Sequence, residues 1–119
     1  MNAALTKVLA ISFILLGEAF AIYAEITAAK NHNITSQPFM TAFLKMFPLI
    51  ILGGGFLLVG YILGYKSFQN IWIVSALSIT SILIIEPILY YSLFQQMPTN
   101  GALIGLLLGA LGFVISLVF

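Results

Sequence analysis

Apolar residues fill four long stretches of the chain, which polar residues interrupt at only three places. The apolar stretches cover residues 4–28, 38–65, 71–94 and 101–119, and the polar interruptions cover residues 30–38, 66–70 and 95–100. Each apolar stretch approaches or exceeds the roughly 20 residues that an α-helix needs to cross a bilayer. The pattern therefore predicts an all-α fold, in which residues 1–119 form one integral membrane domain of four transmembrane helices with short loops.

The composition supports a membrane protein and excludes several other classes. Hydrophobic residues make up 62% of the chain and charged residues only 6%, so a soluble domain could not hide its apolar surface. The net charge of +1 gives no basic patch, and we therefore expect no nucleic-acid partner. Because the chain has no cysteine and His32 is its one histidine, we expect no metal site, no cofactor and no enzymatic activity.

The four lysines give the membrane orientation almost no bias. An even number of spans puts both termini on one side of the membrane, together with Lys7 and Lys66, whereas Lys30 and Lys45 fall on the other side. Orientation follows the excess of lysine and arginine in the cytoplasmic loops. Because the two sides carry equal numbers, the sequence is compatible with insertion in both directions.

Three glutamates lie within the apolar stretches: Glu18, Glu25 and Glu86. A carboxylate inside hydrocarbon is costly and usually functional, so each is a candidate for binding a proton or a substrate. Glu18 lies near the middle of the first stretch, and Glu25 follows on the same helical face about 10 Å further along. The alternatives are structural: a Glu18 hydrogen-bonded to a neighbouring helix, a Glu25 at the lipid headgroups, and a Glu86 that shapes a helix break with Pro87.

Ser75 joins these candidates because of its spacing from Glu86. The two residues are eleven positions apart, close to three helical turns, and therefore lie on one face. Pro87 cannot donate a backbone hydrogen bond, which leaves the carbonyl group of Leu83 free beside Glu86. The candidates for substrate or proton binding are thus Glu18, Glu25, Glu86 and Ser75.

Small residues form a stripe on two of the predicted helices. In the last apolar stretch, glycines recur at spacings of four, four and three: Gly101, Gly105, Gly109 and Gly112. The first stretch carries a similar face, made of Gly17, Ala21, Ala24 and Ala28. Such stripes let helix backbones touch in lipid, so both faces are predicted to lie against other helices.

These features together resemble the small multidrug resistance transporters. The stretch Leu16-Gly17-Glu18-Ala19 is similar to the segment that carries the essential glutamate of that family. Residues 84–116 also resemble the end of an EamA-like half in the drug/metabolite transporter superfamily, with Glu86-Pro87, a polar turn and then the glycine stripe. The resemblance covers essentially the whole chain and implies a multi-pass protein of a bacterial inner membrane.

The resemblance implies an antiporter that exports a small cationic or amphiphilic compound in exchange for protons. Four helices are too few to enclose a substrate path, so the chain would act as a homodimer or as a heterodimer with a paralogue. Glu18 of each subunit would bind either a proton or the substrate. The alternatives are a non-transporting accessory subunit of a larger membrane complex, with Glu18 and Glu86 bonded to partner helices, and a subunit of a lipid-linked sugar flippase. Membrane lipids are partners in every case.

Overall fold

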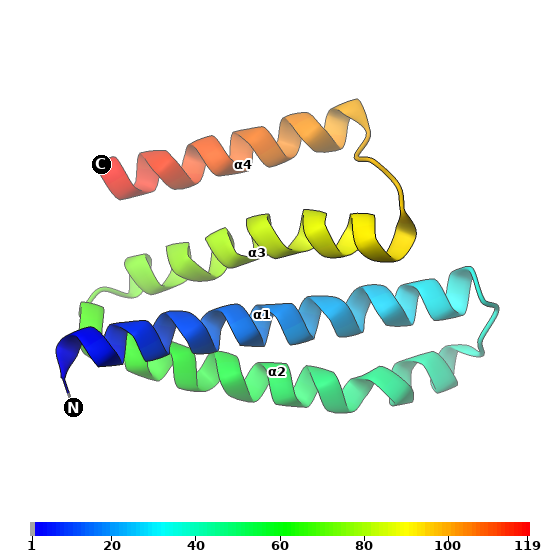
Figure 1. Ribbon diagram of the computed structural model, residues 1–119, viewed down its shortest axis with the longest axis horizontal. Coiled ribbons are helices and arrows are strands. Elements are labelled where there is room, and N and C mark those ends of the chain that lie inside the picture. Colours follow the sequence, from blue (N-terminus) through cyan, green and yellow to red (C-terminus); the bar gives the residue numbers. More distant parts are fainter. Residues whose placement is uncertain (1) are drawn as a thin grey trace.

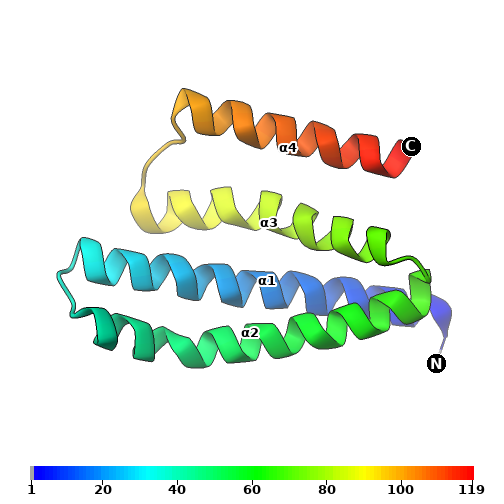
Figure 2. The same cartoon turned by 180° about the vertical axis from the view of Figure 1, so that it is seen from behind.

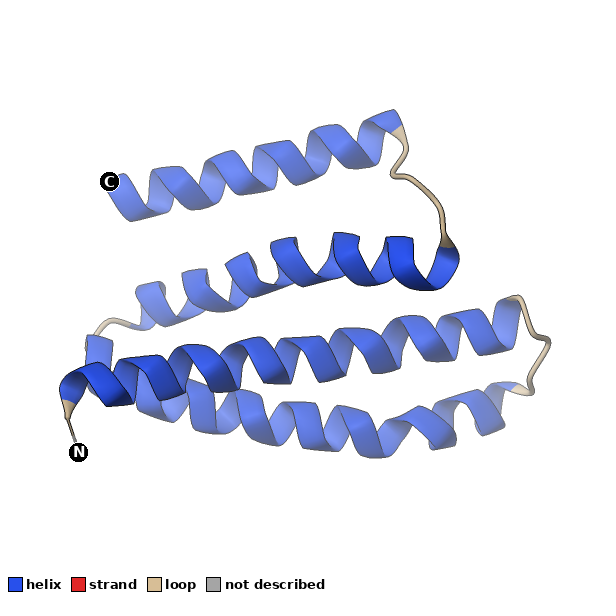
Figure 3. Ribbon diagram, viewed as in Figure 1, coloured by secondary structure: helices blue, strands red, loops and turns tan. Residues whose placement is uncertain are grey.

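The computed structural model describes residues 2–119, with only the backbone described at residue 117. Four α-helices account for most of the chain, and short loops join them (Figure 3). Their bounds are α1 Ala3–Asn33, α2 Phe39–Phe68, α3 Ile71–Phe94 and α4 Asn100–Val118. The all-α, four-helix architecture that the sequence predicts is therefore confirmed.

Three helices, α1, α2 and α3, are long and apolar enough to cross a membrane by length and composition. The chain is therefore a multi-pass membrane protein. α4 is apolar as well, but the part that counts toward a span, Asn100–Ser116, is shorter. A fourth crossing of the membrane stays a prediction.

The helices lie in a flat row in which α1 and α3 run parallel to each other and antiparallel to α2 and α4 (Figure 1). Figures 1 and 2 agree on the order α2, α1, α3, α4 across the molecule. The principal extents are 48 × 34 × 18 Å, and a helix with its side chains is about 10–12 Å wide, so the row is less than two helices thick. The start of α1 and the end of α4 lie at the same end of the molecule (Figure 1).

α1 is the central helix and touches α2 through its backbone. Its residues Ile14 and Ala24 are fully buried. A Cβ atom on Gly17 would lie 2.8 Å from the carbonyl oxygen of Gly53, and a Cβ atom on Gly53 would lie 2.9 Å from that of Gly17. No side chain larger than hydrogen fits between them, so this contact sets the rotation of α1 against α2. The close packing predicted for the Gly17 face occurs here.

α3 packs against α1, and α4 packs against α3 alone among the described residues. Val74, Ser78 and Ser81, at spacings of four and three, form the buried stripe of α3. The two small serines let α3 come close to α1. No described side chain of α4 is buried, and this helix touches α3 where Gly109 meets Leu83.

The first two loops are shorter than the sequence pattern predicts, because the helices extend into the polar segments. α1 takes in residues 30–33 and α2 takes in residues 66–68. Asn33 Nδ2 donates to the carbonyl of Ala29 at 2.8 Å, and Ser67 Oγ donates to the carbonyl of Leu63 at 2.9 Å. Both helices thus continue by about one turn beyond their apolar stretches.

Candidate functional site

The deepest carboxyl group of the chain forms a hydrogen bond between α1 and α3. Ser78 Oγ donates to Glu18 Oε1 at 2.6 Å, and Glu18 is only 8% exposed. Glu18 lies halfway along α1, so the pair is deep within the span. The bond satisfies one oxygen of a carboxyl group that is costly to bury without a partner.

The contact between α1 and α2 aims Glu18 at α3. Gly17 touches Gly53, and an α-helix turns by about 100° per residue, so the side chain that follows Gly17 points away from α2. On α3, Ser81 donates to the Leu77 carbonyl of its own helix at 2.8 Å, whereas Ser78 donates across the interface. Ser78 is therefore the partner that α3 supplies to the carboxyl group of Glu18.

Helical spacing from Glu86 predicts Ser75 as the serine of the site, whereas the structure places Ser78, three positions later, against Glu18. The signal that identifies Ser78 is the series Val74, Ser78, Ser81, whose spacing puts two small polar residues on one helical stripe. Ser75 lies outside this stripe and is only half-buried. Its neighbours are instead those of a cavity between α3 and α4.

Glu25 follows Glu18 on α1, but its side chain is exposed. Glu25 lies about 10 Å along the helix from the middle of α1, which is still inside a hydrocarbon core about 15 Å thick on each side of its centre. A charged carboxylate at that depth is costly in contact with lipid.

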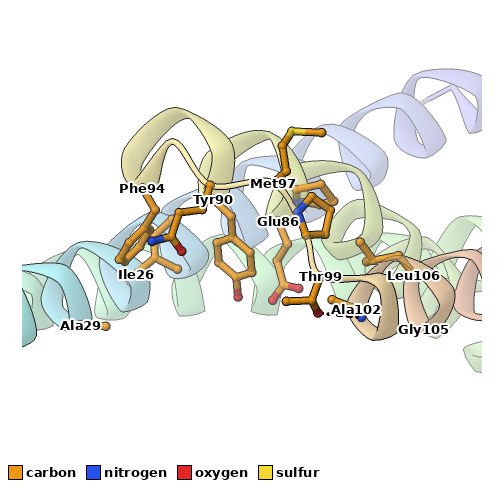
Figure 4. Close-up of a pocket in the computed structure, with 13 residues that line it drawn as sticks. Ile26, Ala29, Glu86, Tyr90, Phe94, Met97, Thr99, Ala102, Gly105 and Leu106 are labelled. Atoms are coloured by element: carbon orange, nitrogen blue, oxygen red, sulfur yellow. Dashed lines mark hydrogen bonds between the residues drawn. The ribbon is translucent and has the colours of Figure 1, made fainter.

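Glu86 lines a cavity of about 690 Å³ between the last turns of α1 and α3 and the start of α4. Figure 4 shows that Glu86 and Tyr90, one turn apart on α3, point the same way. Ile26 and Ala29 of α1 and the turn at residues 96–99 complete the wall. The volume falls within the range of about 300–1,000 Å³ that small-molecule sites occupy, and most of the lining is apolar.

A second cavity, of about 550 Å³, lies between α3 and α4 toward the other end of the molecule. Its lining includes Ser75, Trp72 and Ser116. Ser75 and Glu86 both face the groove between α3 and α4, as their spacing predicts, but they are about 16 Å apart along the helix and lie in different cavities. The structure thus brings Glu86 together with Tyr90 and leaves Ser75 apart.

The glycine stripe of α4 lies along this groove. Gly105 lines the first cavity and Gly112 lines the second. Gly109 separates them, because a Cβ atom there would lie 3.3 Å from Leu83 Cδ2. A Cβ atom on Gly101 would have no neighbour within 4 Å. Within the described part of this chain, Gly109 alone makes the predicted helix contact, and contact of the stripe with a second chain stays a prediction.

The two lysines that bracket α1 have partners other than the carboxylates. Lys30 Nζ donates to the carbonyl of Leu93 at 2.9 Å, at the C-terminal end of α3. Lys7 Nζ lies 5.3 Å from the ring centre of Phe68. A cation is favourable at a helix C-terminus and over an aromatic ring. Neither lysine therefore serves as the counter-ion of Glu18.

Among the described residues, no group of three or more metal-ligating side chains comes together. Comparisons of the chain with protein-family models, with curated proteins and with solved structures found no match. The interpretation of the site therefore depends on its geometry and its chemistry.

Proposed function

We propose that the chain is a subunit of a transporter similar to the small multidrug resistance and EamA-like proteins, exporting a small cationic or amphiphilic compound in exchange for protons. The observation that carries the proposal is the group of carboxyl groups at Glu18, Glu25 and Glu86, inside the apolar spans of α1 and α3. Ionisable groups at this depth are costly and mark proton or ion pathways. The proposed location is a bacterial inner membrane.

Glu18 is the coupling group of this proposal. A carboxyl group that holds either a proton or a cation cannot hold both, so competition for it links the two fluxes. With Ser78 bonded to Glu18 and both side chains buried, the arrangement described above corresponds to an occluded state. Exchange requires that Ser78 release the carboxyl group and that α3 move away from α1.

The uncovered sides of the bundle support a dimer as the active form. Glu25 is exposed at membrane depth, and α4 stands at the edge of the row with one neighbour, α3. A second chain beside α1 and α4 would remove the charge of Glu25 from lipid and would enclose the space that a substrate path needs. The partner in this proposal is a second copy of the chain or a paralogue.

The second candidate is a non-transporting subunit of a larger membrane complex. The bond between Ser78 and Glu18 favours it, because a carboxyl group satisfied within its own chain needs no exchange. In that case Glu18 stabilises the contact between α1 and α3, and the exposed apolar faces pack against other subunits. The two candidates differ in what replacement of Glu18 changes: coupled flux in the first, and assembly or stability in the second.

Uptake by purified protein in liposomes tests the proposal. The probe is radiolabelled hexyltrimethylammonium, whose permanent charge prevents it from carrying a proton and slows its passage through a protein-free bilayer. With an acidic lumen, we expect the wild type to accumulate the probe and Glu18→Gln to lose this accumulation. Gln keeps the size of Glu and still accepts a hydrogen bond from Ser78, so assembly is expected to persist.

Ser81→Ala is the matched control for this experiment. Ser81 belongs to the same buried stripe as Ser78 but donates to its own helix, so gradient-driven uptake is expected to remain in this variant. Equal uptake by the wild type and Glu18→Gln, or no uptake above protein-free liposomes, contradicts the transport proposal. Loss of assembly in Glu18→Gln favours the structural subunit instead.

A further inference from the structure

We propose that the cavity lined by Glu86 binds the cationic head of a single-chain amphiphile, and that Leu83 limits the length of the chain this site accepts. The site is distinct from the buried pair of Glu18 and Ser78. In the occluded state Glu18 is buried and accepts a hydrogen bond from Ser78, and it lines neither of the two cavities. Glu86 lines the first cavity, so its carboxylate is the one that a cation in this cavity would meet. A role of this site in transport rests on the proposed function, whereas binding of the amphiphile at equilibrium does not.

The groups around Glu86 suit a cation and disfavour an anion. The carboxylate of Glu86 faces the same side as the hydroxyl group of Tyr90 (Figure 4), and Phe94 also lines the cavity. Aromatic rings attract a quaternary ammonium group. An anionic head would instead be repelled by Glu86.

The rest of the cavity suits an apolar chain. Ile26 of α1, Met97 of the turn and Leu106 of α4 contribute to its wall. Small-molecule sites usually combine a mostly apolar wall with a few polar groups that fix the orientation of the ligand. Here the wall would contact the alkyl chain and the carboxylate would bind the charged head. The occupant that this lining fits is therefore an amphiphile with one cationic head and one chain.

Leu83 stands where such a chain would leave the first cavity. Both cavities belong to the groove between α3 and α4, and Leu83 meets Gly109 between them. Ile79, which lines the second cavity, lies about 10 Å along α3 from Glu86. A chain that fills the first cavity and continues must therefore displace the side chain of Leu83.

Trp72 makes the passage of a chain measurable. It is the single tryptophan of the sequence and it lines the second cavity. A bromine atom at the end of the chain quenches tryptophan fluorescence on contact. Quenching of Trp72 by an amphiphile whose head is at Glu86 therefore reports that the chain has passed Leu83.

The first experiment measures equilibrium binding of hexyltrimethylammonium to protein in nanodiscs, with no gradient. We expect Glu86→Gln to weaken binding by at least about tenfold, because the charge-assisted contact is lost. Tyr91→Phe is the control: it removes a polar group of the same helix that is exposed and does not line the cavity, and it is expected to change binding by less than about threefold. Equal affinity of the wild type and folded Glu86→Gln overturns the site.

The second experiment tests Leu83 with hexadecyltrimethylammonium brominated at the chain end, because Trp72 lies about 21 Å along α3 from Glu86 and a shorter chain would not reach it. The specific signal is the Trp72 quenching that Glu86→Gln abolishes, which removes the contribution of amphiphile dissolved in lipid. We expect Leu83→Ala to join the two cavities, to increase this quenching and to shift the binding preference toward the hexadecyl over the hexyl compound. Ile84→Ala removes an exposed side chain of the same helix and is expected to leave the preference unchanged.

The outcomes separate this site from the proposed function. Binding of the hexyl compound that depends on Glu86, together with no gradient-driven uptake, supports the site and contradicts the transport proposal. If uptake depends on Glu18 but binding of the hexyl compound is the same with and without Glu86, the transport proposal is supported and the Glu86 site is contradicted. An unchanged chain-length preference and unchanged quenching in Leu83→Ala overturn the role of Leu83.

Discussion

Replacing Gly53 with alanine is expected to destabilise the bundle, whereas the same change at the next residue, Gly54, is expected to stabilise it. Alanine is favoured over glycine inside a helix by about 1 kcal/mol, and both variants share this gain. At Gly53 the new Cβ atom would lie 2.9 Å from the carbonyl oxygen of Gly17 and 3.1 Å from the backbone nitrogen of Ala21. At Gly54 it would have no neighbour within 4 Å.

The difference between the two variants measures the contact between α1 and α2. Backbone atoms cannot rotate aside, so α1 and α2 must separate in Gly53→Ala, and overpacking of this kind costs about 1–3 kcal/mol. With the helix gain included, we expect Gly53→Ala to lose up to about 2 kcal/mol of unfolding free energy and Gly54→Ala to gain up to about 1 kcal/mol.

Titration of the purified protein with sodium dodecyl sulfate in mixed micelles, followed by circular dichroism, provides the unfolding free energies. Because the two glycines are neighbours on α2, the variants share detergent, helix and length, and their difference is more reliable than either value. A Gly53→Ala variant that is as stable as Gly54→Ala, or more stable, would refute the direct backbone contact and with it the argument that this contact aims Glu18 at α3.

Three further predictions concern the hydrogen bond, the α4 stripe and the orientation. Ser78→Ala should lower the unfolding free energy by about 1 kcal/mol in the same titration, as typical hydrogen bonds between membrane helices do; a loss no larger than that of Ser81→Ala would count against the bond. Gly109→Leu should disrupt oligomers in cross-linking, because its side chain would collide with Leu83 and fill the stripe; unchanged oligomers would argue against a packing role. Two lysines added at the C-terminus should bias reporter fusions to one side of the membrane, whereas a single firm orientation of the unmodified chain alone would remove the dual-orientation idea.

The fold follows from the sequence because apolar length is a strong signal. Four long apolar stretches separated by short polar segments leave few other structures for a chain of this composition. The helix ends differ from the ends of the apolar stretches at Asn33 and Ser67, because a helix can continue into polar residues that hydropathy assigns to a loop.

The pairing of helices follows less directly from the sequence. The glycine stripe of α4 is as clear in the sequence as Gly17 and Gly53 are. The contact between helix backbones nevertheless occurs between Gly17 and Gly53. Spacing identifies a face that can pack closely, but it does not identify the helix that packs on it.

The candidate site was predictable in part. The depth of Glu18 and Glu86 in their helices is visible from position alone. Ser78 was not identified, because a serine on an apolar helix is common and its partner is sixty positions away in the chain. Helical spacing correctly put Ser75 and Glu86 on one side of α3, but it could not show that Leu83 and Gly109 divide the groove between them.

The measurement that tests the central claim most directly is the release of protons when a cation binds. Hexyltrimethylammonium carries no exchangeable proton, so any acidification of a weakly buffered protein solution on its addition comes from the protein. The test uses a Glu86→Gln background, which removes the cavity site proposed for the same probe. If Glu18 holds either a proton or the substrate, this chain should release protons, the added change Glu18→Gln should abolish the release, and the added change Ser81→Ala should leave it unchanged. Binding without proton release in the Glu86→Gln chain, or equal release after Glu18→Gln in a folded protein, would contradict the claim that Glu18 couples the two fluxes.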